Sequence, residues 1–200
     1  SLLRAGLDRL STVATSMELS STGSADQLRA VTIDGVLRPS LAAVYGPGRT
    51  YWRALVEVTG RVGVGTAGLW GIAPGCPGLL LDAGSCPERA FDVLVSSAEA
   101  SVQGWTVGTQ LQARDSYLAP GRQPVPFPSP LTVVGTYTQL PDDPAWLGIT
   151  LGGRAGATKP GLTDEPLLDA LVTTERTFTP TAGDGITTWR EWGGATLSVV

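Results

Sequence analysis

The side chains of this chain that could do chemistry are its acids, two cysteines and six tryptophans, because histidine is absent. Without an imidazole, no Ser-His-Asp or Cys-His relay can activate a nucleophile within these residues. A glycosidase would instead need two carboxylates that face each other across a cleft. The candidate acids lie in expected loops and turns, where acids usually only stabilise the local backbone: Asp82, Glu88, Asp115, Asp142, Asp143 and Glu165. We therefore predict no enzyme and no cofactor, and rank an extracellular enzyme using two acids last among the alternatives.

Cys76 and Cys86 flank a segment rich in glycine and proline. A structural zinc site within this chain is nearly excluded, because histidine cannot complete a set of four ligands. We predict a disulfide that closes a loop of about ten residues and adds roughly 2–3 kcal/mol. Such a bond favours an oxidising location outside the cytoplasm. In the alternative, the two side chains are small buried hydrophobic groups.

The tryptophans allow two interpretations. They could stack on a sugar or lipid ligand, or they could pack in the core and between lobes, which we favour. Trp189 and Trp192 lie near the end of the chain and are the best candidates for an exposed contact with a partner. We add Trp146 as a third candidate contact.

The composition is that of a folded, loop-rich protein. Hydrophobic residues make up 42% of the chain, with 26 glycines and 15 prolines. The net charge is −4 and no cluster of Lys and Arg occurs, so neither a nucleic acid nor an anionic membrane surface is an expected partner. No apolar run approaches the ~18 residues of a membrane span. The abrupt start at Ser1 suggests a piece of a longer protein.

The apolar patterning predicts mainly strands, with few helices. Helices are expected over 2–10, 24–37 and from Thr163 into Leu168. The glycines of the segment 60–65 lack the order of a dinucleotide-binding loop and are interpreted as β-bulges. The segment 61–70 is then either a strand with bulges or one arm of a hairpin. Strands are expected over 51–59, 61–70, 79–82, 91–95, 106–113, 131–138, 169–178, 187–192 and 195–200.

The segment from Val95 to Leu111 carries the most specific pattern. Ser96 and Glu99 form an S-x-x-E capping box, in which each side chain satisfies a backbone N–H of the first helical turn. Gly104 stands where a short helix needs a left-handed residue to end. The segment therefore predicts a strand, a helix of one to two turns, a glycine stop and a second strand.

This segment resembles the pattern V-S-E-x-x-A-x-x-L-G-L-x-V-G-D-x-L in the extracytoplasmic domains of ABC-transporter permeases of the FtsX/MacB type. Two further segments are similar to this family: 131–137 to the T-V-V-G-V-Y strand of these permeases, and 139–148 to the D-P-D-D-P-Y-W-L-G of their actinobacterial members. Ser97 replaces the usual Glu and Thr109 the usual Asp. The matching residues of the first pattern are Val95, Ser96, Ala98, Ala100, Gly104, Val107, Gly108 and Leu111.

The resemblance implies an α+β, two-lobed MacB-like periplasmic core domain on the extracytoplasmic face of the cell membrane. A β-α-β lobe near the membrane would comprise 1–60 and 131–200, and an inserted strand-rich lobe with one short helix would comprise 61–130. The implied function is non-catalytic: to transmit ATP-driven motion, or to engage substrate or partner proteins outside. The implied partners are the flanking transmembrane helices of the permease, a cytoplasmic ATPase, and a dimer mate or second permease half. The alternative is a secreted glycan- or lipid-binding module.

Overall fold

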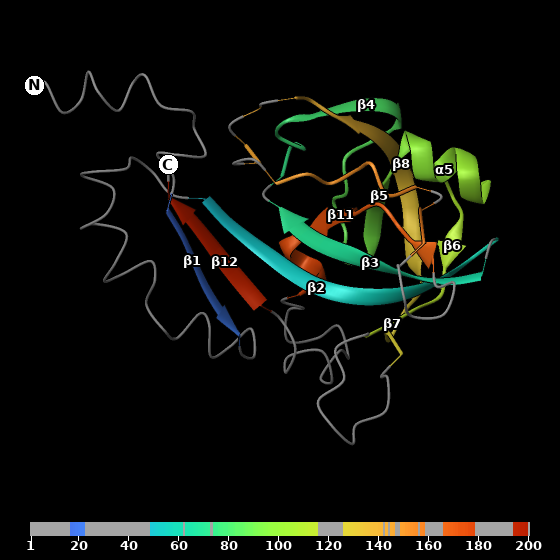
Figure 1. The fold of residues 1–200 in the computed structure, drawn as a ribbon, viewed down its shortest axis with the longest axis horizontal. Helices are drawn as coiled ribbons and strands as arrows, with labels where there is room; N and C mark the ends of the chain where they lie inside the picture. The colour runs from blue at the N-terminus through green and yellow to red at the C-terminus, as the bar shows by residue number, and fades with distance from the viewer. Residues whose placement is uncertain are drawn as a thin grey trace, which may run out of the picture.

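The computed structural model places the strands that it describes in one mixed β-sheet (Figure 1). The described residues are 17–22, 49–61, 63–72, 74–115, 126–141, 143, 145–146, 149–155, 157–158, 166–178 and 194–199. The elements are β1 (Met17–Thr22), β2 (Arg49–Gly60), β3 (Gly63–Ile72), β4 (Leu79–Gly84), β5 (Asp92–Ser96), α5 (Ser97–Gln103), β6 (Gln110–Leu111), β7 (Ala113–Asp115), β8 (Leu131–Gln139), β9 (Ala157–Thr158), β10 (Pro166–Leu167), β11 (Leu171–Thr174), the 3₁₀ helix η2 (Glu175–Thr177) and β12 (Gly194–Val199).

The main strand order is β1-β12-β2-β3-β11-β5-β8-β4. The pairs β5–β8 and β11–β3 are parallel, whereas β2–β3, β4–β8 and β12–β2 are antiparallel. In Figure 1, β1, β12 and the start of β2 lie at the opposite end of the molecule from α5, which lies beside β8.

Two hydrophobic cores lie on the two faces of the central strands. Val93 and Val95 of β5 belong to one core, and Leu94 between them belongs to the other. Leu171 and Val172 of β11 divide in the same way. Strands that are buried on both faces need continuous apolar runs, and this explains the composition of β5.

The expected α+β class is confirmed, because the described residues form a strand-rich mixed sheet with one short α-helix. The strands expected over 51–59, 79–82, 91–95, 131–138 and 195–200 correspond to β2, β4, β5, β8 and β12. The division into lobes at residues 60 and 130 stays a prediction. Strands from both predicted parts pair in this sheet, since β3 of 61–130 lies between β2 and β11.

The strand expected over 61–70 corresponds to β3, and its interpretation as a hairpin arm is confirmed, whereas the β-bulges predicted at the glycines of 60–65 are wrong. β2 and β3 form a hairpin whose register runs without a shift from Trp52 opposite Gly71 to Gly60 opposite Gly63. Gly65 is required by packing, because a Cβ there would lie 2.8 Å from Cγ of Leu168.

Three other expected elements differ in the structure. Residues 106–109 form a turn closed by the Thr109 N–H and the Thr106 carbonyl, so only β6 and β7 remain of the strand predicted over 106–113. The strand predicted over 169–178 ends at Thr174 and continues as η2. The helix predicted into Leu168 is wrong at its described end, because Pro166–Leu167 pairs with both β3 and β9. The elements expected over 2–10, 24–37 and 187–192 lie outside the described residues.

Candidate functional site

The capped helix α5 lies where the sequence predicts it. The side chain of Ser96 accepts a hydrogen bond from the Glu99 N–H at 3.0 Å. Gly104 ends the helix in the left-handed conformation, with φ 71° and ψ 27°, and its N–H bonds to the Ala100 carbonyl. Ser96 is also the last residue of β5, so the helix starts directly from the sheet.

The role predicted for Glu99 in the capping box, to bind a backbone N–H of the first helical turn, is wrong. Its Oε2 accepts from the backbone N–H of Asp169 at 3.1 Å, and its Oε1 accepts from Nε2 of Gln103 at 2.9 Å. The N-cap residue, Ser96, is the last residue of β5 and lies in register with Tyr137 of β8. The carboxylate is therefore used to bind a distant segment of the sheet.

Asp169 forms the other half of this buried polar cluster. Its Oδ2 accepts from the Ser96 hydroxyl, and its Oδ1 accepts from the N–H groups of Arg154 and Ala155 at 2.6 and 3.1 Å. Asp169 is 1% exposed and Glu99 is fully buried. Buried acids normally carry such hydrogen bonds. The two acids join β5, α5 and the segments 151–155 and 168–170.

Burial governs the electrostatics of this cluster. Desolvation raises the pKa of Glu99, partly opposed by its hydrogen bond from Gln103, because a charge is disfavoured away from water. Burial also raises the pKa of the Tyr137 hydroxyl, which donates to the Ala170 carbonyl at 2.8 Å. No open cleft separates two facing carboxylates in this cluster, and both acids are occupied by hydrogen bonds within the described residues.

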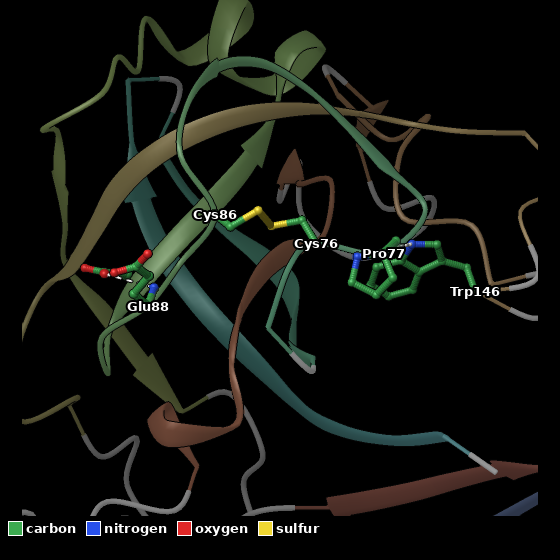
Figure 2. The surroundings of a disulfide bond; sticks show 6 residues. Cys76, Pro77, Cys86, Glu88 and Trp146 are labelled. Atoms are coloured by element: carbon green, nitrogen blue, oxygen red, sulfur yellow. Dashed lines mark hydrogen bonds between the residues drawn. A yellow bond between two sulfur atoms is a disulfide. The ribbon is translucent and has the colours of Figure 1, made fainter. Parts of the chain in front are cut away.

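Cys76 and Cys86 form the predicted disulfide, with their Cα atoms 5.9 Å apart (Figure 2). The bond links the segment before β4 to the segment after it. Figure 2 also shows the Trp146 indole beside Pro77, and its Nε1 donates to the Pro77 carbonyl at 3.0 Å. A hollow of about 430 Å³ lies next to the disulfide, between Cys86, Pro87 and η2.

The candidate contact Trp146 is only 1% exposed. Its ring packs edge-on against Trp70 with centroids 6.5 Å apart, so this side chain lies in a core. Trp189 and Trp192 lie outside the described residues. A contact with a partner through these tryptophans stays a prediction.

The candidate catalytic acids are not brought together where the structure describes them. Asp82 is exposed and accepts from the hydroxyls of Ser97 and Thr138. Glu88 is exposed, and its backbone N–H donates to the carboxylate of Asp92. Asp143 accepts a hydrogen bond from the Ala145 N–H within a turn. The side chain of Asp115, and all of Asp142 and Glu165, lie outside the description.

The described part of the chain contains no group of three or more His, Cys, Asp or Glu side chains that could hold a metal ion. It also contains no helix with the length and apolar character needed to cross a bilayer.

Comparison with known proteins gives likenesses to solved structures and none to a known sequence or family. No family model matches the chain, and no curated protein matches its sequence. Among solved structures, the chain is similar to the extracellular domain of the noncanonic ABC-type transporter YknZ from Gram-positive bacteria. The TM-score is 0.40 and the identity 15%, over 92% of this chain and 83% of that chain. A likeness at this level does not establish a shared function, so we base the proposed function on the residues themselves.

Sequence reasoning found Glu99 but missed its partners. Asp169 lies 70 residues further along the chain, and no local pattern links the two. The one available signal was the apolar run after Asp169, which indicates that this acid stands at the entrance of a buried strand.

Proposed function

We propose that this chain is a non-catalytic extracytoplasmic domain of an ABC-transporter permease, of the FtsX/MacB type in its actinobacterial form. In this role the domain transmits motion driven by a cytoplasmic ATPase, or engages substrate or partner proteins outside the membrane. The observation that carries the proposal is the strand–capped helix–glycine segment from Val95 to Leu111, whose sequence resembles these permeases.

The hydrogen bonding of that segment fits a mechanical part. The buried acids tie α5 to two segments of the chain that follow β8, so the helix cannot shift without breaking several bonds at once. A body that transmits force needs this kind of rigid connection between distant segments. The same bonds occupy the carboxylates, which leaves them poorly placed for acid–base chemistry.

The disulfide supports the proposed compartment. Cys76 and Cys86 are bonded across a sequence separation of 10 residues, and such bonds persist in oxidising surroundings outside the cytoplasm. This supports an extracytoplasmic face and does not depend on the likeness to a permease.

The alternative of a secreted glycan- or lipid-binding module receives less support. Sugar binding usually uses an aromatic face that is open to solvent. Trp70, Trp105 and Trp146 are 8, 7 and 1% exposed. None of these three offers an open stacking face.

The experiment is co-purification of the full-length parent protein from its own membrane. The protein carries an affinity tag, is extracted with a mild detergent, and the bound proteins are identified by mass spectrometry. We expect an ATPase subunit to be enriched over a control purification with an unrelated tagged membrane protein. Recovery without any ATPase, from a reading frame that has no flanking apolar spans, would contradict the proposal.

A further inference from the structure

A second hollow, of about 300 Å³, opens on the face of β2 and β3 that is turned away from the capped helix. Trp70 and Gly68 of β3 lie opposite Arg53 and Leu55 of β2 in the hairpin register. Gly68 carries no side chain, and the Trp70 indole lies over it: a Cβ at Gly68 would be 3.0 Å from Nε1 of Trp70. The hollow lies between these residues and the segment 149–154.

The wall formed by that segment is fixed by hydrogen bonds. Gln139 at the end of β8 binds it twice: its Nε2 donates to the Ile149 carbonyl at 2.6 Å and its Oε1 accepts from the Leu151 N–H at 2.8 Å. The Ala170 N–H donates to the Leu151 carbonyl at 2.7 Å. Asp169 holds the Arg154 N–H at 2.6 Å. A site whose walls are held in this way loses little freedom when a ligand binds.

Two arginines give the hollow its charge. The guanidinium carbon of Arg53 lies 5.0 Å from the centroid of the Trp70 ring, a cation–π contact that holds it over the floor. Arg154 lines the hollow from the opposite wall. Of the residues that the structure describes, no acidic side chain lines the hollow.

The nearby acids are already engaged. Glu57, on the same face of β2 as Arg53, is in an ion pair with Arg114. Asp169 accepts from Ser96 and from backbone N–H groups. Among the described residues, neither Arg53 nor Arg154 is in an ion pair. The hollow therefore has two positive charges that the described part of the chain does not neutralise.

The rest of the lining is one polar residue, Thr150, the glycine Gly68 and a set of apolar side chains. The apolar side chains are those of Leu55, Trp70, Ile149, Leu151 and Ala170. Leu55 is 40% exposed, so part of this surface is open to solvent. A ligand suited to the hollow needs an anionic head for the guanidinium groups and an apolar body for the floor.

We propose that this hollow, the arginine hollow, binds a small organic carboxylate that carries an apolar chain or ring. Arg53 and Arg154 bind the carboxylate, and the apolar body lies against Leu55 and the small part of Trp70 that lines the hollow. The proposal does not rest on the permease role, because it depends only on the chemistry of the residues that line the hollow.

The probe is 3-phenylpropionate, titrated into the ¹⁵N-labelled protein while the indole N–H resonance of Trp70 is followed by NMR. The Trp70→Phe variant assigns that resonance. Three comparison compounds separate the contributions: 3-phenylpropionamide lacks the charge, inorganic phosphate lacks the apolar body, and phenyl phosphate tests a different anionic head. We expect a saturable shift with the carboxylate, and weaker binding of the amide and of inorganic phosphate.

Matched variants test the two arginines. Arg53→Gln and Arg154→Gln are each expected to weaken binding about tenfold, in line with the loss of one charge-assisted hydrogen bond. Arg61→Gln removes the same charge from an exposed arginine outside the hollow and should leave the affinity unchanged. Arg53→Lys should restore part of the affinity, because it keeps the charge but not the bidentate geometry. Thermal unfolding of each variant checks that the fold is intact.

Three results would overturn the proposal. The first is the absence of a saturable shift at Trp70 up to the solubility limit of the probe. The second is equal binding of the amide or of inorganic phosphate. The third is an equal loss of affinity in Arg61→Gln, which would indicate a general charge effect. Tighter binding of phenyl phosphate than of 3-phenylpropionate would contradict a carboxylate ligand and indicate that the anionic group is a phosphate ester.

Discussion

The backbone N–H of Asp169 donates a hydrogen bond to Oε2 of Glu99 at 3.1 Å, across a sequence separation of 70 residues. The acid that the sequence predicts as a local helix cap thus holds the entrance of β11 against α5. Both residues are buried. Glu99 also accepts a hydrogen bond from Gln103 of its own helix, and Asp169 accepts one from the Arg154 N–H. Glu99 therefore connects the most recognisable motif of the chain to the rest of the sheet.

Removing the Glu99 carboxylate should destabilise the protein. Glu99→Ala leaves the Asp169 N–H and the Gln103 amide without this acceptor, and we expect a loss of roughly 2–4 kcal/mol in the free energy of unfolding. Urea denaturation followed by circular dichroism measures it. The control is Glu88→Ala, because Glu88 is exposed and should change stability by less than about 0.5 kcal/mol. Equal losses in the two variants would contradict this account of the cluster.

Glu99 should also make stability depend on pH. Its pKa is raised in the folded protein above the ordinary value of 4.5, so the folded state binds the proton more tightly than the unfolded state. The stability from this group is therefore complete below about pH 4.5 and is lost as the pH rises through the folded pKa. Relative to Glu99→Gln, which cannot titrate, the wild-type free energy of unfolding should fall over that window. If the free energy of unfolding of the wild type, relative to that of Glu99→Gln, stays constant or rises with pH, Glu99 does not titrate in this way.

The pairing of β4 with β8 depends on a glycine that no other residue can replace. Gly84 has φ +78°, and a Cβ there would lie 2.0 Å from the Val134 carbonyl oxygen. We expect Gly84→Ala to cost roughly 3 kcal/mol or more, the sum of left-handed strain and a clash with backbone. Gly104→Ala is the matched control: it has nearly the same φ, +71°, but its closest contact is 3.9 Å away.

For Gly104→Ala only the strain remains, about 1–2 kcal/mol. Chemical denaturation of both variants compares the two costs directly. If Gly104→Ala proved as costly as Gly84→Ala, the close approach between β4 and β8 would not explain the loss at Gly84.

The disulfide should contribute measurably to stability. For a loop of this length the loss of unfolded-state entropy corresponds to about 2–3 kcal/mol. Reduction of the wild type, or the double substitution Cys76→Ser and Cys86→Ser, should lower the urea midpoint by a corresponding amount. A reducing agent should have no effect on the double variant. Sensitivity of the double variant to the reductant would show that the agent acts elsewhere.

Local patterns predicted the elements that local chemistry decides. β8 alternates in burial along its length, and Ser96 and Gly104 bound a helix by capping rules, so these were correct. The failures lie where a distant segment competes. Gly65 is explained by the packing of Leu168, and Pro166–Leu167 becomes a strand because it lies beside β3.

The arginine hollow could not be predicted for the same reason. Arg53 and Arg154 are separated by about half the chain. The β2–β3 register and the hydrogen bonds from Gln139, Asp169 and Ala170 bring them to one opening. Sequence patterns report what a residue's near neighbours require. They contain no information on which loop will cover which face of a sheet.

The most direct test of the central claim is the accessibility of this domain to an external protease in intact protoplasts that express the full-length parent protein. The account predicts that the parent protein is found in the membrane fraction and that added protease removes the domain without lysis. A cytoplasmic ATPase in the same cells serves as the control for membrane integrity. Protection of the domain until lysis, or recovery of the parent protein in the soluble fraction, would contradict the account.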